Sequence, residues 1–219
     1  MTTNEKPKTY GVLDIGSNSV RALVYSEGKA LFKGLVTTRL GEKESIGREI
    51  TAEAQERTIN GIKKLLVNIV FFSPDRIFAF ATEAVRSAKN GGEFVKKVKA
   101  ETGLDIDVLS GEAEGEAGLS GAVESGDGGI IDIGGASVEL TAGADGKITY
   151  AESLKLGVVR VRDAIGSDRA AIENYYRKQI CGYKKISADK LYAIGGTATS
   201  LASMLLRQKT YDADAVHGY

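Results

Sequence analysis

Two short segments of the chain place an aspartate next to glycine and hydroxyl side chains in the same order. Residues 14–19 read DIGSNS, and residues 132–137, which lie 118 positions further on, read DIGGAS. With the valine that follows each segment, five of seven aligned positions are identical. Glycine permits a positive φ and a close approach of the backbone, so consecutive N–H groups can form an anion-binding concavity. The repeated segment therefore predicts phosphate binding.

The aspartate at the start of each segment needs a separate explanation. A carboxylate beside a phosphate repels it, unless the carboxylate holds a hard cation such as Mg²⁺, directly or through water. The alternative is that Asp-Ile-Gly only closes a tight hairpin. For one segment alone the two interpretations are evenly balanced, and the repetition at equivalent places favours a functional site.

Three further segments carry candidate groups. Residues 193–199, AIGGTAT, predict a strand, a Gly-Gly turn and a helix start, and helix N-termini favour anions. Glu112, Glu114 and Glu116 follow Ser110 at the start of another expected helix, where acidic residues are favourable surface charges. Arg86 follows a strand and either reaches the phosphates or is a solvated helix arginine.

Composition excludes several classes of chemistry. Cys181 and His217 are the only cysteine and histidine, which excludes an intrachain disulfide and argues against a histidine metal cluster or a Ser-His-Asp triad. We expect Cys181 to be a small packing residue. Lys plus Arg and Asp plus Glu number 29 each, so no general attraction to nucleic acid or to an anionic membrane is expected. No apolar stretch approaches the roughly twenty residues of a membrane span, and we expect a cytoplasmic protein.

The hydrophobic periodicity predicts the same order of elements, βββ-α-β-α, twice along the chain. Strands are expected at 9–15, 20–26, 30–38, 76–81, 105–109, 129–133, 138–142, 147–154 and 190–194, and helices at 51–72, 92–102, 112–124, 158–164, 168–180 and 197–207. The glycine-rich residues 125–129 predict a linker. We therefore expect two α/β lobes with mixed sheets, residues 1–125 and 126–219, whose repeated loops face one cleft.

Seven segments in this order resemble motifs of the Ppx/GppA family, the exopolyphosphatases and guanosine pentaphosphate phosphatases of the actin-like ATPase superfamily. They are 11–19 (GVLDIGSNS), 38–41 (TRLG), 81–86 (ATEAVR, with Asn90), 110–115 (SGEAEG), 131–140 (IDIGGASVEL), 156–160 (LGVVR) and 193–197 (AIGGT). The resemblance covers nearly the whole chain and implies two ribonuclease H-like (actin-like) lobes.

The resemblance also implies a role for each matching residue. Glu114 would be the general base toward the attacking water, and Arg86 would bind the phosphate chain. Asp132 and Glu139 would hold a divalent cation, Mg²⁺ or Mn²⁺, with Asp14 nearby. The residues that would cradle phosphates are Gly16, Ser17, Asn18, Ser19, Gly134, Gly135, Ser137, Gly195, Gly196 and Thr197.

The chain departs from the family pattern at a few positions. Ala136 stands where a third glycine is usual, Val138 where threonine is frequent, and Glu116 where arginine is common. Family chains continue beyond the region around His217, which implies that the second lobe is C-terminally shortened. An unfinished lobe exposes a sheet edge and apolar surface, so we expect a homodimer or a partner chain to cover it.

The leading functional hypothesis is metal-dependent hydrolysis of terminal phosphoanhydride bonds in polyphosphate or guanosine pentaphosphate, by water attack assisted by Glu114. Sequence does not choose between these substrates, because both present a phosphoanhydride end. Two alternatives stay open: a non-catalytic module that binds polyphosphate or guanosine penta- or tetraphosphate, and an ATP-dependent kinase or ATPase of the same superfamily.

Overall fold

The computed structural model describes residues 7–42, 49–123, 127–186 and 188–219. The chain forms two compact units, Met1–Leu109 and Ser110–Tyr219. Helix α5 (Gly111–Ala122) opens the second unit and packs on strands of the second sheet. The division therefore falls earlier than the expected boundary at residues 125 and 126, because this helix packs with the strands that follow it.

The first unit is built on a five-stranded mixed sheet with the order β3-β2-β1-β4-β5. Its strands are β1 (Thr9–Ile15), β2 (Ser19–Ser26), β3 (Lys29–Thr37), β4 (Arg76–Ala81) and β5 (Ile106–Val108). The first three strands pair antiparallel, whereas β4 runs parallel to β1 and β5 parallel to β4. The mixed sheet expected for this lobe is confirmed.

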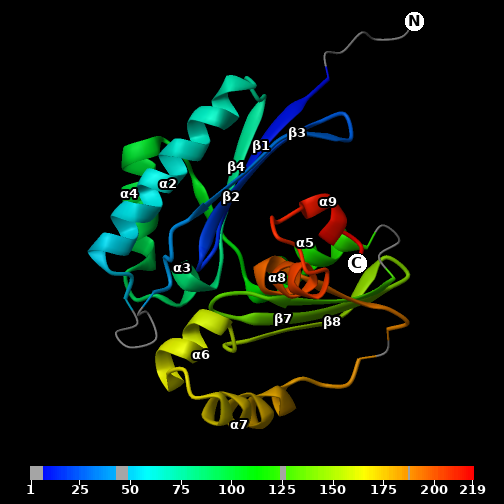
Figure 1. The fold of residues 1–219 in the computed structure, drawn as a ribbon. Coiled ribbons are helices and arrows are strands. Elements are labelled where there is room, and N and C mark those ends of the chain that lie inside the picture. The colour runs from blue at the N-terminus through cyan, green and yellow to red at the C-terminus, as the bar shows by residue number, and fades with distance from the viewer. Residues whose placement is uncertain (1–6, 43–48, 124–126, 187) are drawn as a thin grey trace, which may run out of the picture. The chain divides into compact units, whose positions relative to one another are not determined.

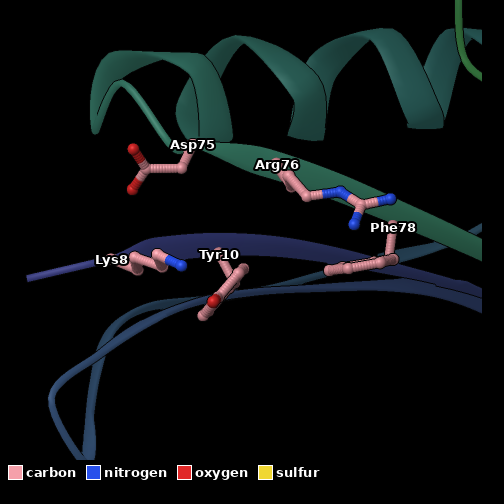
Figure 2. Close-up of a pocket in the computed structure, with 5 residues that line it drawn as sticks. All are labelled: Lys8, Tyr10, Asp75, Arg76 and Phe78. Carbon is pink, nitrogen blue, oxygen red and sulfur yellow. The ribbon is translucent and has the colours of Figure 1, made fainter.

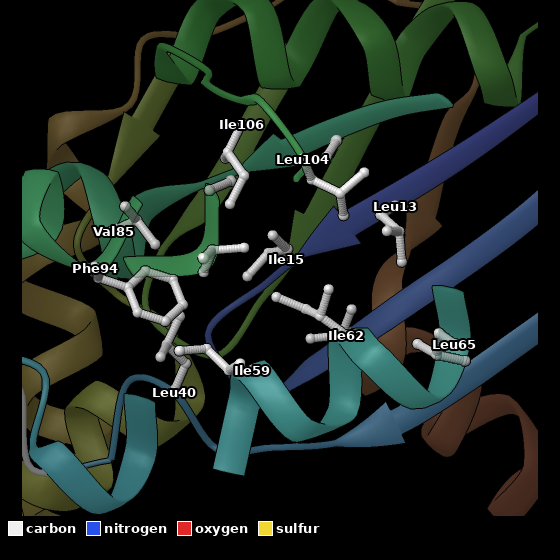
Figure 3. Close-up of a cluster of buried hydrophobic side chains, with 14 of the residues drawn as sticks. Leu13, Ile15, Leu40, Ile59, Ile62, Leu65, Val85, Phe94, Leu104 and Ile106 are labelled. Carbon is white, nitrogen blue, oxygen red and sulfur yellow. The ribbon is translucent and has the colours of Figure 1, made fainter. Parts of the chain in front are cut away.

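Among the described residues, the helices of the first unit are α2 (Ala52–Phe71), α3 (Glu83–Ser87) and α4 (Gly91–Thr102). Helices α2 and α4 lie on the same side of the sheet (Figure 1). The hydroxyl of Thr51 accepts from the Ala54 N–H at 3.2 Å and so caps the start of α2. The helices and strands enclose one apolar core, in which Ile59, Ile62 and Phe94 are almost fully buried (Figure 3).

The second unit repeats this plan with a four-stranded sheet in the order β8-β7-β6-β9. Its further elements are β6 (Gly128–Ile133), β7 (Val138–Ala144), β8 (Lys147–Leu154), α6 (Val158–Ile165), α7 (Arg169–Gln179), the 3₁₀ turn η1 (Ile180–Gly182), β9 (Leu191–Ile194), α8 (Gly195–Leu205) and α9 (Ala213–Val216). A small apolar cluster of Leu119, Val123 and Ile130 packs between α5 and the sheet. In the described part of this unit, no strand pairs beyond β9.

The two sheets share their strand register. Asp14 pairs with Arg21 across β1 and β2, and Asp132 pairs with Glu139 across β6 and β7. The register shifts at equivalent places, between Val24 and Tyr25 in one sheet and between Ala142 and Gly143 in the other. The repeated mixed α/β architecture expected from the sequence is confirmed.

Some details differ from the expectations. The five residues of α3 were not predicted as a helix, and Cys181 is exposed on the surface turn η1 rather than packed. No helix in the described ranges is long and apolar enough to cross a membrane.

Candidate functional site

The two repeated loops close with the same hydrogen bond. The Gly16 N–H donates to the Ser19 carbonyl at 3.0 Å, and the Gly134 N–H donates to the Ser137 carbonyl at 3.1 Å. A Cβ on either glycine would lie 3.2 Å from that carbonyl oxygen. Neither glycine has a positive φ. The expectation of a positive φ was therefore wrong for these glycines, and close approach is what requires them.

The carbonyl groups of the second loop, residues 134–137, are bound by the segment that follows β8. The four N–H groups of residues 157–160 donate to the carbonyls of residues 134–136 at 2.9–3.1 Å. In a trans peptide the carbonyl and the next N–H point in opposite directions. The N–H groups of Gly135, Ala136 and Ser137 are therefore directed away from this segment. Three consecutive amides oriented together are a suitable arrangement for an anion.

The first loop, residues 16–19, is supported in the same way. The Ser17 carbonyl accepts from the Gly41 N–H at 2.9 Å, and the Asn18 carbonyl accepts from the N–H groups of Thr38 and Arg39 at 3.0 and 2.9 Å. The amides of Asn18 and Ser19 are accordingly turned away from residues 38–41. Each loop is thus held by the segment that follows the third strand of its own sheet.

Ala136, which replaces the usual third glycine, fits the second loop without strain. It does not have a positive φ, and it is buried. The position that has no room for a side chain is instead Gly157. An added Cβ there would lie 2.3 Å from backbone atoms of Gly135 and Ala136. Gly157 has φ −60° and ψ 148°, which any residue adopts, so the requirement for glycine here is purely steric.

Asp132 and Glu139 lie side by side at the loop end of β6 and β7. As register partners on adjacent strands their side chains share one face of the sheet. Glu139 is only 2% exposed and accepts a hydrogen bond from the Ser153 hydroxyl at 2.7 Å. In the first unit, the residue opposite Asp14 is the basic Arg21. The paired carboxylates are therefore a property of the second unit.

Asp132 also touches the start of α8. Gly195 has φ +86°, and a Cβ there would lie 2.2 Å from the Asp132 Oδ1 atom. Both its conformation and the neighbouring carboxylate therefore require glycine. The expected helix begins directly at Gly195, without a separate turn. The Gly-Gly-Thr segment and the second loop consequently meet at Asp132.

Glu114 lies in the first turn of α5, which Ser110 caps by accepting from the Ala113 N–H at 3.1 Å. Glu114 is partly buried, whereas Glu112 and Glu116 are exposed. The surface roles expected for those two residues agree with this exposure. Glu114 therefore differs structurally from the acidic residues beside it.

Two glycines bring α5 onto the face of the second sheet that carries the paired carboxylates. A Cβ on Gly115 would lie 2.2 Å from the Thr141 hydroxyl oxygen, and one on Gly118 would lie 2.8 Å from Ile130. Side chains alternate along strands, so Thr141 shares its face with Glu139, and Ile130 shares its face with Asp132. Glu114, adjacent to Gly115, thus belongs to the helix that covers this face.

Arg86 belongs to the first unit and is held there. Its Nε and Nη2 atoms donate to the buried carboxylate of Glu83 at 3.1 and 2.8 Å, and Nη1 donates to the Leu109 carbonyl. Leu109 is the last residue of the first unit. Arg86 therefore anchors the point where the chain leaves that unit, and a phosphate-binding role for it remains a prediction.

A shallow pocket of about 420 Å³ lies at the other end of β1 from the first loop. Lys8, Tyr10, Asp75, Arg76 and Phe78 line it (Figure 2). The Arg76 guanidinium lies 5.0 Å from the centre of the Phe78 ring. None of the residues expected to bind phosphate is in this lining.

Among the residues that the structure describes, no three acidic, histidine or cysteine side chains are close enough to hold a metal ion. The second unit brings together loop 134–137, Asp132, Glu139, the start of α8 and the helix that carries Glu114. The first unit carries Asp14, loop 16–19 and Arg86. A cleft shared by the two loops stays a prediction.

Comparison with known proteins places the chain in a family. A model of the Ppx/GppA phosphatase family matches residues 23–219. The chain belongs to this family. The first loop precedes the matched range, whereas the second loop, Glu114 and the α8 start all lie within it.

Individual relatives agree with this assignment. A Ppx/GppA family member from Aquifex aeolicus is 30% identical, with 98% of this chain and 74% of that chain covered and a TM-score of 0.77. An exopolyphosphatase from Cytophaga hutchinsonii is 26% identical, with 93% and 72% covered and a TM-score of 0.77. The chain therefore shares the two-lobed actin-like fold of the family and is shorter than these relatives.

A further relative is a bifunctional 3-dehydroquinate synthase/phosphatase from Fusobacterium nucleatum. It is 28% identical over 235 residues, which cover 94% of this chain and 35% of that protein. The chain thus spans about a third of the length of this relative.

Proposed function

We propose that this Ppx/GppA family chain hydrolyses the terminal phosphoanhydride bond of a phosphate chain, either inorganic polyphosphate or guanosine pentaphosphate. The observation that carries the proposal is the second loop, whose three consecutive amides are directed to one side next to the carboxylates of Asp132 and Glu139. Oriented amides stabilise charge that develops on phosphoryl oxygens.

Asp132 and Glu139 would hold a divalent cation, Mg²⁺ or Mn²⁺, with Asp14 as a further carboxylate. Like charges opposite each other on neighbouring strands are destabilising, so two adjacent carboxylates favour a bound cation. Mg²⁺ is commonly bound by one or two carboxylates plus substrate phosphates, which matches this donor set. When bound, the cation would neutralise charge on the phosphate oxygens.

The other candidate residues would activate the water and hold the phosphate chain. Glu114 would accept a proton from the attacking water and orient it. The phosphate chain would be held by the amides and hydroxyls of both loops, with Gly195, Gly196 and Thr197 beside the second loop. Arg86 would bind the phosphate chain through its guanidinium group, whose planar N–H donors match phosphate oxygens.

The decisive experiment measures phosphate release by the 219-residue chain from long-chain polyphosphate and from guanosine pentaphosphate, with Mg²⁺. We expect Glu114→Gln to lower kcat by about 10²–10⁴-fold, the usual contribution of a general base. Glu116→Gln, an exposed acid on the same helix, is the matched control and should leave kcat unchanged.

Three outcomes separate the alternatives. Absence of phosphate release by the folded wild-type chain would contradict the enzyme proposal, and tight binding without turnover would favour a binding module. Faster turnover of ATP than of polyphosphate would favour a kinase or ATPase.

We also propose that the chain acts in the cytoplasm as a homodimer and binds neither nucleic acid nor membranes. The support for a homodimer is the unpaired outer side of β9 in the described part of the second sheet, together with exposed apolar side chains on α8. The equal numbers of acidic and basic residues give the chain no general attraction to nucleic acid or to an anionic membrane.

A further inference from the structure

We propose that Arg160 is a positioning residue for the second loop, and that it sets the direction of the Ser137 amide toward a bound phosphate. The inference rests on the proposed phosphate binding by this loop. Two hydrogen bonds join Arg160 to the loop: its backbone N–H donates to the Gly135 carbonyl at 3.0 Å, and its Nε donates to the Ala136 carbonyl at 3.0 Å.

The second contact fixes one peptide plane. The Ala136 carbonyl accepts from both the Gly157 N–H, at 3.1 Å, and Arg160 Nε, so both of its lone pairs are used. The Ser137 N–H belongs to the same trans peptide and points the other way. A positive charge on the carbonyl side also polarises this peptide, which makes its N–H a stronger donor.

Arg160 is itself held by the elements around it. It lies in the first turn of α6 and is partly buried. The Tyr176 hydroxyl on α7 donates to the Leu156 carbonyl at 3.0 Å, directly before Gly157. The next residue, Val161, is buried in the helix. The support of the second loop therefore extends through α6 to α7.

Both loops have backbone support, but the first loop has a less direct contact from an arginine side chain. There the arginine is Arg57 on α2, which donates from Nε to the Thr38 carbonyl and from Nη2 to the Arg39 carbonyl at 3.2 Å. Those carbonyls belong to the segment behind the loop and not to the loop itself. Within the described ranges, an arginine side chain therefore contacts the backbone of the second loop and not that of the first, and the second loop is the one beside the paired carboxylates.

Substitutions of Arg160 distinguish positioning of the second loop from a nonspecific effect of positive charge on phosphate binding. Arg160→Met keeps the aliphatic stem and removes the Nε donor, and Arg160→Lys keeps the charge without the planar N–H geometry. Arg162→Met is the matched control, because it removes the same charge from an exposed position on the same helix.

The binding experiment measures inorganic tripolyphosphate by calorimetry in the presence of Mg²⁺. We expect Arg160→Met to weaken binding on the order of tenfold, as for the loss of a charge-assisted hydrogen bond. Arg160→Lys should not restore it, and Arg162→Met should bind like the wild type. Restoration by lysine, or equal weakening in both methionine variants, would overturn the proposal.

NMR of the ligand-free chain tests the role of Arg160 independently of the proposed hydrolysis. We expect Arg160→Met to shift the carbon-13 resonance of the Ala136 carbonyl and the amide resonance of Ser137, while Arg162→Met leaves both in place. Unchanged resonances in Arg160→Met would sink the inference even if tripolyphosphate binds. Failure of the wild type to bind tripolyphosphate counts against the proposed function, whereas these resonances test Arg160 alone.

Discussion

At the residue scale, Tyr183 connects the segment before β9 to the strand that carries Glu139. Its hydroxyl donates to the Val138 carbonyl. Burial raises the pKa of Tyr183 above the ordinary tyrosine range, and the negative charge of Glu139 raises it further. The fold therefore favours the neutral hydroxyl of Tyr183.

This shift predicts a specific loss of stability in alkali. Because the folded pKa is raised, the contribution is complete below the ordinary tyrosine pKa of about 10 and is lost as pH rises from there. Tyr183→Phe should lower the free energy of unfolding at pH 7 by about 1 kcal/mol, through loss of the hydrogen bond. It should also make unfolding less sensitive to pH above 10.

Urea denaturation at several pH values checks this expectation, with Tyr219→Phe, an exposed tyrosine, as the control. A wild-type chain and a Tyr183→Phe variant that lose stability in parallel above pH 10 would contradict it.

At the element scale, α5 offers two glycines with opposite environments. A Cβ on Gly115 would meet the Thr141 hydroxyl oxygen at 2.2 Å, whereas one on Gly121 would meet nothing within 4 Å. Gly115→Ala should lower the free energy of unfolding by about 1–3 kcal/mol through overpacking. Gly121→Ala should raise it by about 0.5 kcal/mol, because alanine restricts the unfolded chain and favours the helix.

Chemical denaturation measures the free energy of unfolding of both variants and of the wild type. Gly115→Ala should also reduce the proposed hydrolysis, since it moves the helix turn that carries Glu114. Equal effects of the two substitutions on stability would show that α5 does not pack as closely as described.

The sequence predicted the bounds of helices and strands well where the local pattern of apolar and turn residues determines them. Strands β1, β4 and β8 have the predicted bounds, because alternating or continuous apolar residues end at turn residues. Short α3 was missed because five residues give no helical period. The requirements at Gly157 and Arg160 were not predicted, since they arise only where residues 157–160 meet a loop more than twenty positions earlier. A motif match at residues 156–160 marked this segment without indicating its contacts.

At the scale of the whole molecule, the two units share one sheet topology but differ at the edge of the sheet. Both sheets share their central register, but the first continues past β4 with β5, and β9 has no such neighbour in the described part of the second sheet. On α8, the helix that follows β9, Leu201, Met204 and Leu205 expose 51%, 69% and 69% of their surface. These positions share one helical face, and an open strand edge is a template for pairing.

We therefore expect the 219-residue chain to self-associate through the surface of β9 and α8. Light scattering after size-exclusion chromatography should give a dimer, and Leu201→Gln with Leu205→Gln should shift it toward the monomer. Val67→Gln, at a 73% exposed apolar position on α2, is the control and should leave the mass unchanged. The reason for this difference is that Val67 is remote in sequence from the unpaired edge, whereas Leu201 and Leu205 lie on the helix that follows β9. A wild-type chain that stays monomeric at every concentration, or a dimer that Val67→Gln disrupts equally, would rule out this surface as the site of association.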